Sequence, residues 1–329
     1  MSFPFPQRTR RRSSYGSSLF GQSGRSRSSY GRRGKGIPVR LLIGLAIVGF
    51  SLLSYYFKTD VNPITGEEQR VALEDEADEV AIGFQAAPGM IEQHGGRLTG
   101  EAGALVDEVG NELVRAMEVQ YLDGQQNPYR FEFFLLADSQ TVNAFALPGG
   151  PVFITKALYD RLETRGRLAG VLGHEIGHVV ARHGNQRMAQ QKRDQGITNG
   201  VAVASGSYNT AQMAQMAIRT ASMAHGRDQE IESDVWGVRL MPLAGYDPED
   251  LIEVMNVLEA ASGGSKQPEF ASTHPSPENR RGKIAEAIEQ LPDGYLSEVN
   301  PRKSNDPLPP IRSTRRRAPS RSVLESLGL

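Results

Sequence analysis

The chain of 329 residues is long enough for one large domain or two small ones. It contains no cysteine, which excludes disulfide bonds, cysteine-ligated zinc sites and cysteine nucleophiles. The formal net charge of −1 conceals an uneven distribution, because residues 1–59 carry eleven basic and no acidic side chains, whereas residues 60–300 have a net charge of −17.

The N-terminal region combines a basic leader with an apolar run. Residues 1–36 consist mainly of Ser, Gly, Arg and Tyr, which predicts a disordered tail. Leu41–Phe57 has no charged residue and spans about 25 Å as a helix, and Tyr55 and Tyr56 suit a membrane interface. We therefore predict a transmembrane anchor over residues 37–57. A cleavable signal peptide is the alternative, which the long leader and the lack of an A-x-A site disfavour.

The charge distribution predicts the orientation of this anchor. Basic residues near a membrane helix stay on the cytoplasmic side, so the leader is expected in the cytoplasm and the acidic remainder outside it. This places the protein in the inner (plasma) membrane of a bacterial cell. An organellar presequence, which would place the same protein in a mitochondrial inner membrane, is the alternative, but the Gly and Tyr content of the leader disfavours it.

Residues 61–292 are predicted to form one α+β domain that is predominantly helical and contains a small β-sheet. Helical patterning of apolar residues extends from Glu67 to about Gln93 and from Glu101 to about Tyr121. The later part of the domain contains further helical stretches, and the chain shows no internal repeat.

Two short segments of the domain are predicted to be strands. Tyr129–Ala137 and Gly150–Thr155 are rich in aromatic or β-branched residues and are bounded by turn residues. The tripeptide that begins at Pro148 predicts a hairpin turn before the second strand. Residues 293–329, which follow the domain, are rich in Pro and Arg and are predicted to be disordered.

The most informative segment carries the motif H-E-x-x-H. If Leu168 to His183 is one helix, His174 and His178 lie on the same face, and Glu175 lies beside them. Two neutral imidazoles at this spacing hold zinc, and the intervening glutamate takes a proton from the attacking water. On the same helix His183 points more than a right angle away from both histidines, so we expect it to be a structural residue and not a ligand.

A zinc ion that performs chemistry keeps three protein ligands, so one more ligand is needed. The segment "RDQEIESDVWG" offers Glu230 and Asp234, which lie four residues apart and hence on one helix face. One carboxylate would complete the zinc site while the other would hold a ligand imidazole by its second N–H. The alternative is a solvated helix face, on which Arg227 pairs with Glu230.

Four motifs together resemble the zinc metallopeptidases of the HtpX, CAAX-prenyl-protease and Oma type. In chain order they are "NAFALPGGPVFIT", "HEIGHVVARHG", "EIESD" and "STHPSPENR". The resemblance covers about Val61 to Gln290. The CAAX prenyl protease and HtpX are multi-pass membrane enzymes, whereas this chain has one apolar run, so it is more similar to the single-anchored or soluble members, and prenylated substrates are not implied.

The resemblance implies one Zn²⁺ per chain, held by His174, His178 and Glu230, with Asp234 as the partner of a ligand. It also implies that an edge strand lies beside the cleft, to which an extended peptide adds through main-chain hydrogen bonds. The residues expected in this strand are Asn143, Ala144, Phe145 and Ala146.

The resemblance also assigns a role near the zinc to His274, from the loop motif "STHPSPENR". Its imidazole is expected either to donate a hydrogen bond to the developing oxyanion or to cap the zinc, and we favour the oxyanion role. The expected catalytic residues are therefore Glu175 and His274.

These observations together predict a membrane-anchored zinc metalloendopeptidase that acts on protein or peptide substrates, in quality control of the cell envelope. A catalytically silent zinc scaffold that binds protein segments is the alternative, although a scaffold does not need Glu175. Nucleic acid is not an expected partner, because the domain is acidic and the chain has no aromatic-basic recognition motif.

Overall fold

The computed structural model describes residues 37–262, 270, 274 and 279–311. The basic leader and the last eighteen residues, for which disorder is predicted, lie outside the described residues. Within the described chain the fold is predominantly helical with two small sheets, which confirms the predicted α+β class.

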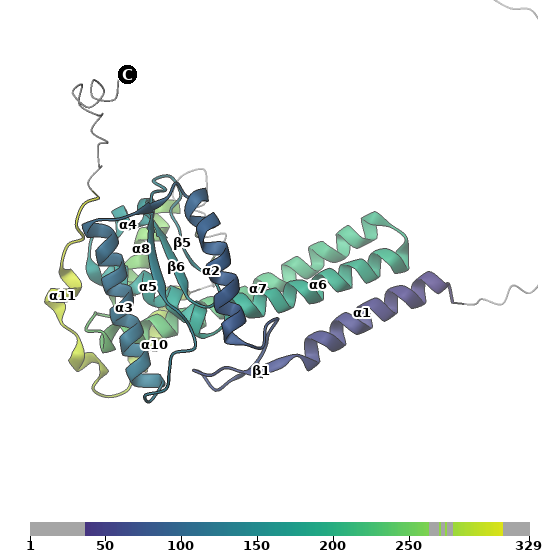
Figure 1. Cartoon of the computed structure of the whole chain (residues 1–329), viewed down its shortest axis with the longest axis horizontal. Helices are drawn as coiled ribbons and strands as arrows, with labels where there is room; N and C mark the ends of the chain where they lie inside the picture. The colour runs from purple at the N-terminus through teal and green to yellow at the C-terminus, as the bar shows by residue number, and fades with distance from the viewer. Residues whose placement is uncertain (1–36, 263–269, 271–273, 275–278, 312–329) are drawn as a thin grey trace, which may run out of the picture. The chain divides into compact units, whose positions relative to one another are not determined.

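Helix α1 (Val39–Phe57) covers the predicted anchor. Most of its apolar side chains are exposed, and among the described residues it is the helix whose length and composition would let it cross a bilayer. It packs along α6, as Figure 1 shows and as the close approach of Gly44 to Gly200 requires.

The predicted helix from Glu67 is wrong at its start. Residues Glu68–Arg70 form strand β2, which pairs antiparallel with β1 (Thr59–Val61). Asn62 closes this hairpin, because its Oδ1 accepts from two backbone N–H groups of the turn while its Nδ2 donates to the carbonyl oxygen of Val180. Helix α2 begins after the hairpin and covers Glu76–Gln93.

The main sheet has four strands in the order β3-β4-β6-β5. β4 and β6 are parallel, and β3 and β5 are antiparallel to their neighbours. The two predicted strands correspond to β4 and β6, while the two short outer strands were not predicted from their composition. The bounds are Arg97–Leu98 for β3, Glu132–Leu136 for β4, Ala144–Ala146 for β5 and Pro151–Thr155 for β6.

Helix α5 (Arg165–Val180) is the centre of the domain. Nearly all of its side chains are buried, because α3 and α8 as well as the sheet and α7 pack against it (Figure 1). The other helices are α3 (Glu101–Tyr121), α4 (Lys156–Leu162), α6 (His183–Ser205), α7 (Tyr208–Leu243), α8 (Asp250–Ser262), α10 (Arg280–Glu289), the 3₁₀ helix η1 (Tyr295–Glu298) and α11 (Pro301–Asn305).

The expectation of one straight helix through His183 is wrong. Helix α5 ends at Val180, and Arg182 adopts the left-handed backbone conformation with φ of 57°, which residues other than glycine rarely adopt. This conformation is held by a fully buried guanidinium, whose Nε donates to Glu79 Oε1 at 2.7 Å and whose Nη1 donates to Asp60 Oδ2 at 2.6 Å. Buried contacts from distant segments therefore override the local helical pattern.

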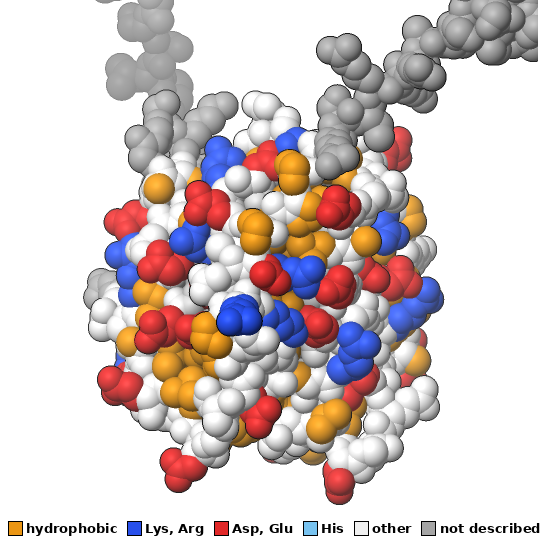
Figure 2. Space-filling model, turned by 90° about the vertical axis from the view of Figure 1, so that its left-hand side faces the viewer, with side chains coloured by type: hydrophobic (Ala, Val, Ile, Leu, Met, Phe, Trp, Pro, Cys, Tyr) orange, Lys and Arg blue, Asp and Glu red, His pale blue; other side chains and the backbone are white. Residues whose placement is uncertain are grey.

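The prediction of disorder from residue 293 is wrong for residues 295–311. This segment contains η1 and α11 and then pairs with the chain just before α5, where the Leu308 N–H donates to the carbonyl oxygen of Glu163 at 2.9 Å. Leu308 and Ile311 pack against the main core. Figure 2 shows the face of the domain on the side of α3, α4 and α11, where acidic and basic side chains are interspersed over the surface.

Candidate metal centre

Close packing of α5 against α7 brings the two sequence motifs together. A Cβ atom on Gly173 would lie 3.2 Å from the Cα of Gly237, and one on Gly177 would lie 2.9 Å from the carbonyl oxygen of Ser233. Each of these α5 glycines directly precedes a histidine of the motif. The absence of a side chain therefore lets the helices approach until His174 and His178 face α7.

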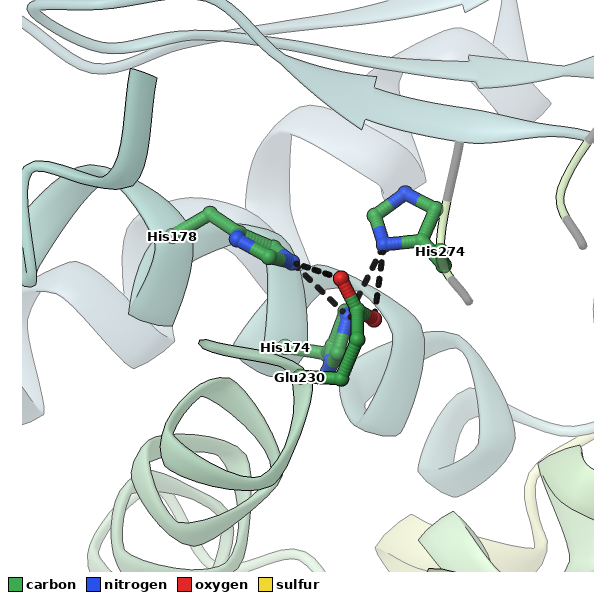
Figure 3. Close-up of side chains that lie close together, drawn as sticks. All are labelled: His174, His178, Glu230 and His274. Carbon is green, nitrogen blue, oxygen red and sulfur yellow. Dashed lines mark hydrogen bonds and ion pairs between the residues drawn. The ribbon is translucent and has the colours of Figure 1, made fainter. Parts of the chain in front are cut away.

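Four buried side chains converge beside this contact: His174 and His178 from α5, Glu230 from α7, and His274 (Figure 3). We call these residues the ligand group. Their ligand atoms all lie within 4.8 Å of one another. His174 Nε2 is 3.1 Å from His178 Nε2 and 3.3 Å from both Glu230 Oε2 and His274 Nδ1. Ligands bound tetrahedrally to zinc lie about 3.3 Å apart, so these spacings fit a zinc site.

Asp234 orients His174. The Nδ1 of His174 donates to Asp234 Oδ1 at 2.8 Å, so that its Nε2 is the nitrogen that faces the ligand group. Arg280 holds the same carboxylate through two hydrogen bonds of 2.7 and 2.8 Å. Both acids of the E-x-x-x-D motif are buried, which contradicts a solvated helix face, and Glu230 has Arg187 and Arg280 as its neighbouring cations.

His183 lies behind His178 and outside the ligand group. Its Nε2 donates to Glu232 Oε2 at 3.1 Å, and its Nδ1 lies 2.8 Å from His178 Nδ1. Since a carboxylate only accepts, His183 Nδ1 is the acceptor for the proton on His178 Nδ1. His178 Nε2 therefore also faces the ligand group with a lone pair, and His183 orients a ligand.

His274 reaches the same point from the other side. Its Nε2 donates to the carbonyl oxygen of Ala144 at 3.2 Å, and its Nδ1 is the nitrogen that faces the ligand group, 3.0 Å from Glu230 Oε2. Its ring stacks on that of Phe270, with 4.4 Å between the centroids. The structure thus places His274 at the fourth position around the centre, the place that a capping role requires.

The electrostatics of the ligand group suit a cation. Burial alone would raise the pKa of Glu230, but the imidazoles of His274, His174 and His178 outweigh burial and hold this pKa well below its usual range. Burial lowers the pKa of His178, which keeps its imidazole neutral as a metal ligand must be. Burial also acts to lower the pKa of His174, but hydrogen bonds with Asp234 and Glu230 raise it to about 9, so the two carboxylates hold a proton here that a bound cation would replace.

Glu175 lies on α5 next to the ligand group. It is fully buried, and among the described residues neither carboxyl oxygen has a hydrogen-bond partner. Burial raises the pKa of this carboxyl, and His274 Nε2 lies 3.5 Å from its Oε1. Burying a carboxylate without hydrogen bonds costs folding free energy. Its oxygens can, however, accept a proton from a bound water, as a general base must.

The expected edge strand lies beside the centre. β5 is the last strand of the sheet, and Asn143 directly precedes it. The β5–β6 turn is fixed against α2, because Gly149 has φ of 77° and a Cβ there would lie 2.3 Å from the Cα of Val80. A cavity of about 140 Å³ separates β5 from α5 and α6, and its lining includes Phe145, Ala146, Leu147, Glu175, His178 and Arg187.

Sequence reasoning missed two arginines at this centre. Arg280 ends the motif "STHPSPENR" and is 5% exposed, so its position in the motif was a signal for a role beside Asp234. Arg182 lies within "HEIGHVVARHG", but its burial against Asp60 and Glu79 depends on residues more than a hundred positions earlier.

Comparison with known proteins matches the part of the chain that holds this centre. The sequence model of peptidase family M48 matches residues 103–288. The beta-barrel assembly-enhancing protease of Escherichia coli (strain K12) is 32% identical over 171 residues, which cover 49% of this chain and 35% of that protein.

Two further relatives carry metallopeptidase names. Mitochondrial metalloendopeptidase OMA1 of Schizosaccharomyces pombe is 34% identical over 160 residues, covering 48% of this chain and 46% of that protein. Metalloprotease YcaL of Escherichia coli (strain K12) is 27% identical over 154 residues, covering 46% of this chain and 59% of that protein. The chain therefore spans between 35% and 59% of the length of these three relatives.

Proposed function

This chain belongs to peptidase family M48, and from that membership we propose that it is a membrane-anchored, zinc-dependent metalloendopeptidase that hydrolyses peptide bonds in proteins. The observation that carries the proposal is the buried carboxylate of Glu175, which has no hydrogen-bond partner among the described residues and lies beside four converging ligand atoms. A zinc scaffold without activity would gain nothing from this costly carboxylate.

His174, His178 and Glu230 would hold the zinc, and Asp234, Arg280 and His183 would keep the two α5 imidazoles oriented. When bound, zinc polarises the scissile carbonyl and lowers the pKa of water. Glu175 takes the proton of the attacking water and delivers it to the leaving amine.

The position of β5 supports recognition of extended segments. A substrate strand that adds to the outer edge of β5 would bring its backbone past Glu175 and His178, which line the same cavity as Phe145 and Ala146. Main-chain hydrogen bonds would then supply affinity with little dependence on substrate sequence. Damaged or misfolded proteins of the cell envelope are the substrate class that we propose, on the resemblance to the metallopeptidase family alone.

His274 would keep this site closed at rest. Its Nδ1 stands with the ligand atoms, and its Nε2 is hydrogen-bonded to the edge strand at Ala144, where a substrate backbone would bind. A substrate would therefore have to displace His274 from both the ligand group and β5. This geometry supports the capping role over the oxyanion role that the sequence favours.

Replacing His274 by alanine should raise the basal rate of casein hydrolysis by about tenfold, because the closed state loses its fourth ligand and its contact with β5. Zinc content measured in the same preparation provides the control, since three ligands remain. A decrease of about 10²–10³-fold at full zinc content would instead assign the oxyanion role to His274. An unchanged rate would reject both roles.

The charge distribution gives the expected topology, with the leader in the cytoplasm and the peptidase domain outside. Alkaline phosphatase, which is active only after export, should therefore be active when fused after residue 329. A cytoplasmic reporter fused at the same point should be silent. The opposite pattern would place the peptidase domain in the cytoplasm. The alternative that the leader is a mitochondrial presequence would then be tested next.

A further inference from the structure

The α6–α7 hairpin (His183–Leu243) carries a long uncharged tip. Between Asp194 and Arg219 no residue is acidic, basic or histidine, although the domain as a whole is rich in charge. We call Gln195–Ile218 the uncharged tip. It contrasts with the face of the domain in Figure 2, where acidic and basic side chains alternate.

The uncharged tip packs tightly against α1 through small residues. Gly196, Gly200 and Ala204 follow one another at intervals of four on α6. A Cβ on Gly200 would lie 2.5 Å from Val48 Cγ2 and 2.7 Å from the carbonyl oxygen of Gly44, so the two backbones are in close contact. Small residues at this spacing are typical of helices that pack together in lipid.

Apolar side chains are exposed on the uncharged tip, among uncharged polar ones such as Gln212 and Gln215. Met213 is 71% exposed and Met216 is 66% exposed on α7, and Val203 of α6 is exposed as well. The lipid-facing side chains expected of α1, such as Phe50, are exposed in the same way. The apolar surface of α1 is therefore continued by the hairpin that packs beside it.

Arginine side chains lie at both ends of this helix packing, and aromatic ones at one end. At the C-terminal end of α1, the Arg193 guanidinium lies 4.6 Å from the centroid of the Tyr55 ring. At the other end, Arg40 Nη1 lies 3.0 Å from the position of a Cβ on Gly206, in the turn of the hairpin. The uncharged tip therefore lies beside α1 from the aromatic C-terminal end of α1 to the N-terminal end of α1, over about 18 Å of α6.

Some polar side chains within the tip form hydrogen bonds along their own helix. Ser205 Oγ donates to the carbonyl oxygen of Val201 at 2.7 Å, and Gln195 Nε2 donates to Asn199 Oδ1 at 2.8 Å. Such bonding within a helix is what a hydrocarbon environment requires of polar residues.

We propose that the uncharged tip lies in the same lipid bilayer as α1, so that three helical segments and not one hold the protein in the membrane. The inference rests on the proposed anchoring through α1. Because α7 runs without a break from Tyr208 to Leu243, the twelve helical steps from Ile218 to Glu230 fix the ligand group within about 18 Å of the hydrocarbon. The substrates within reach are therefore protein segments at the membrane surface.

The lack of cysteine allows a direct test with single-cysteine variants of the full-length chain. Met213→Cys and Met216→Cys report on the tip, Phe50→Cys on α1, and Val119→Cys, at an 84% exposed position of α3, on a surface in water. Each variant is labelled with bimane and reconstituted into phosphatidylcholine–phosphatidylglycerol vesicles with or without acyl-chain nitroxide lipid. We expect both tip variants to be quenched as strongly as Phe50→Cys and Val119→Cys to be unquenched.

Three outcomes would overturn the proposal, and they have different meanings. Tip labels as bright as Val119→Cys while Phe50→Cys is quenched would remove the tip from the bilayer and leave the anchor in place. Tip labels that are shielded from aqueous iodide but not quenched by nitroxide lipid would show that a second protein copy covers them. If Phe50→Cys is also unquenched, the proposed anchoring fails together with the inference. Casein hydrolysis by each variant reports separately on the peptidase.

Discussion

Replacing Glu175 by glutamine is expected to lower the rate of casein hydrolysis by about 10²–10⁴-fold while the zinc content stays stoichiometric. Glutamine has nearly the same shape as glutamate, but it cannot accept the proton of the attacking water at neutral pH. The carboxylate is buried without a hydrogen-bond partner among the described residues, so its replacement breaks no hydrogen bond within that part of the fold. Initial rates on labelled casein, with metal analysis of the same sample, provide the measurement.

Two controls make this result specific to Glu175. Chelation of the zinc should lower the wild-type rate to that of Glu175→Gln, and the thermal unfolding midpoints of the two zinc-loaded proteins should agree within a few degrees. Turnover of Glu175→Gln at a near wild-type rate, with full zinc content, would mean that the proton acceptor lies elsewhere.

Replacing Glu230 by alanine should weaken zinc binding far more than replacing His183 by alanine. Glu230 is fully buried, and its oxygens lie 3.0 to 3.5 Å from the ligand nitrogens of all three imidazoles in the group. Of the ligand group, His183 contacts the second nitrogen of His178, and loss of such an orienting residue lowers metal affinity by about 10–100-fold. Loss of the carboxylate should exceed that range.

The two variants form a matched pair, since each removes one buried side chain that contacts His178. Competition with a fluorescent zinc chelator gives both dissociation constants under the same conditions. Asp234→Asn, which alters an orienting residue of His174, should behave like His183→Ala. Retention of zinc by Glu230→Ala together with its loss from His183→Ala would contradict the proposed ligands.

The helical periodicity of H-E-x-x-H is sufficient to place His174 and His178 on one face, because the spacing of a helix is a local property. The long helix α3 is predicted with its observed bounds for the same reason. The choice between Glu230 and Asp234 as the ligand is not local, and it depends on the resemblance to a family.

The wrong predictions of secondary structure and disorder concern residues whose conformation depends on partners that are distant in the sequence. Glu68–Arg70 has a helical pattern, but it pairs with β1, and Gln69 donates to the carbonyl oxygen of Ala181, 112 residues away. Arg182 breaks the helix because buried acids hold its guanidinium. The segment around Leu308 is ordered by its bond to Glu163, which no composition rule detects. Periodicity describes near neighbours in the chain and carries no information on such contacts.

The narrow cavity along β5 has a consequence for which proteins this family member would cut. A polypeptide enters beside an edge strand only after the segment has left its own helix or sheet, so the target must first open locally. The fraction of time spent open falls tenfold for each 1.4 kcal/mol of local opening free energy, since RT is about 0.59 kcal/mol. An intact protein has a larger free energy of local opening than a damaged one, so the peptidase can discriminate between them without recognising a particular sequence.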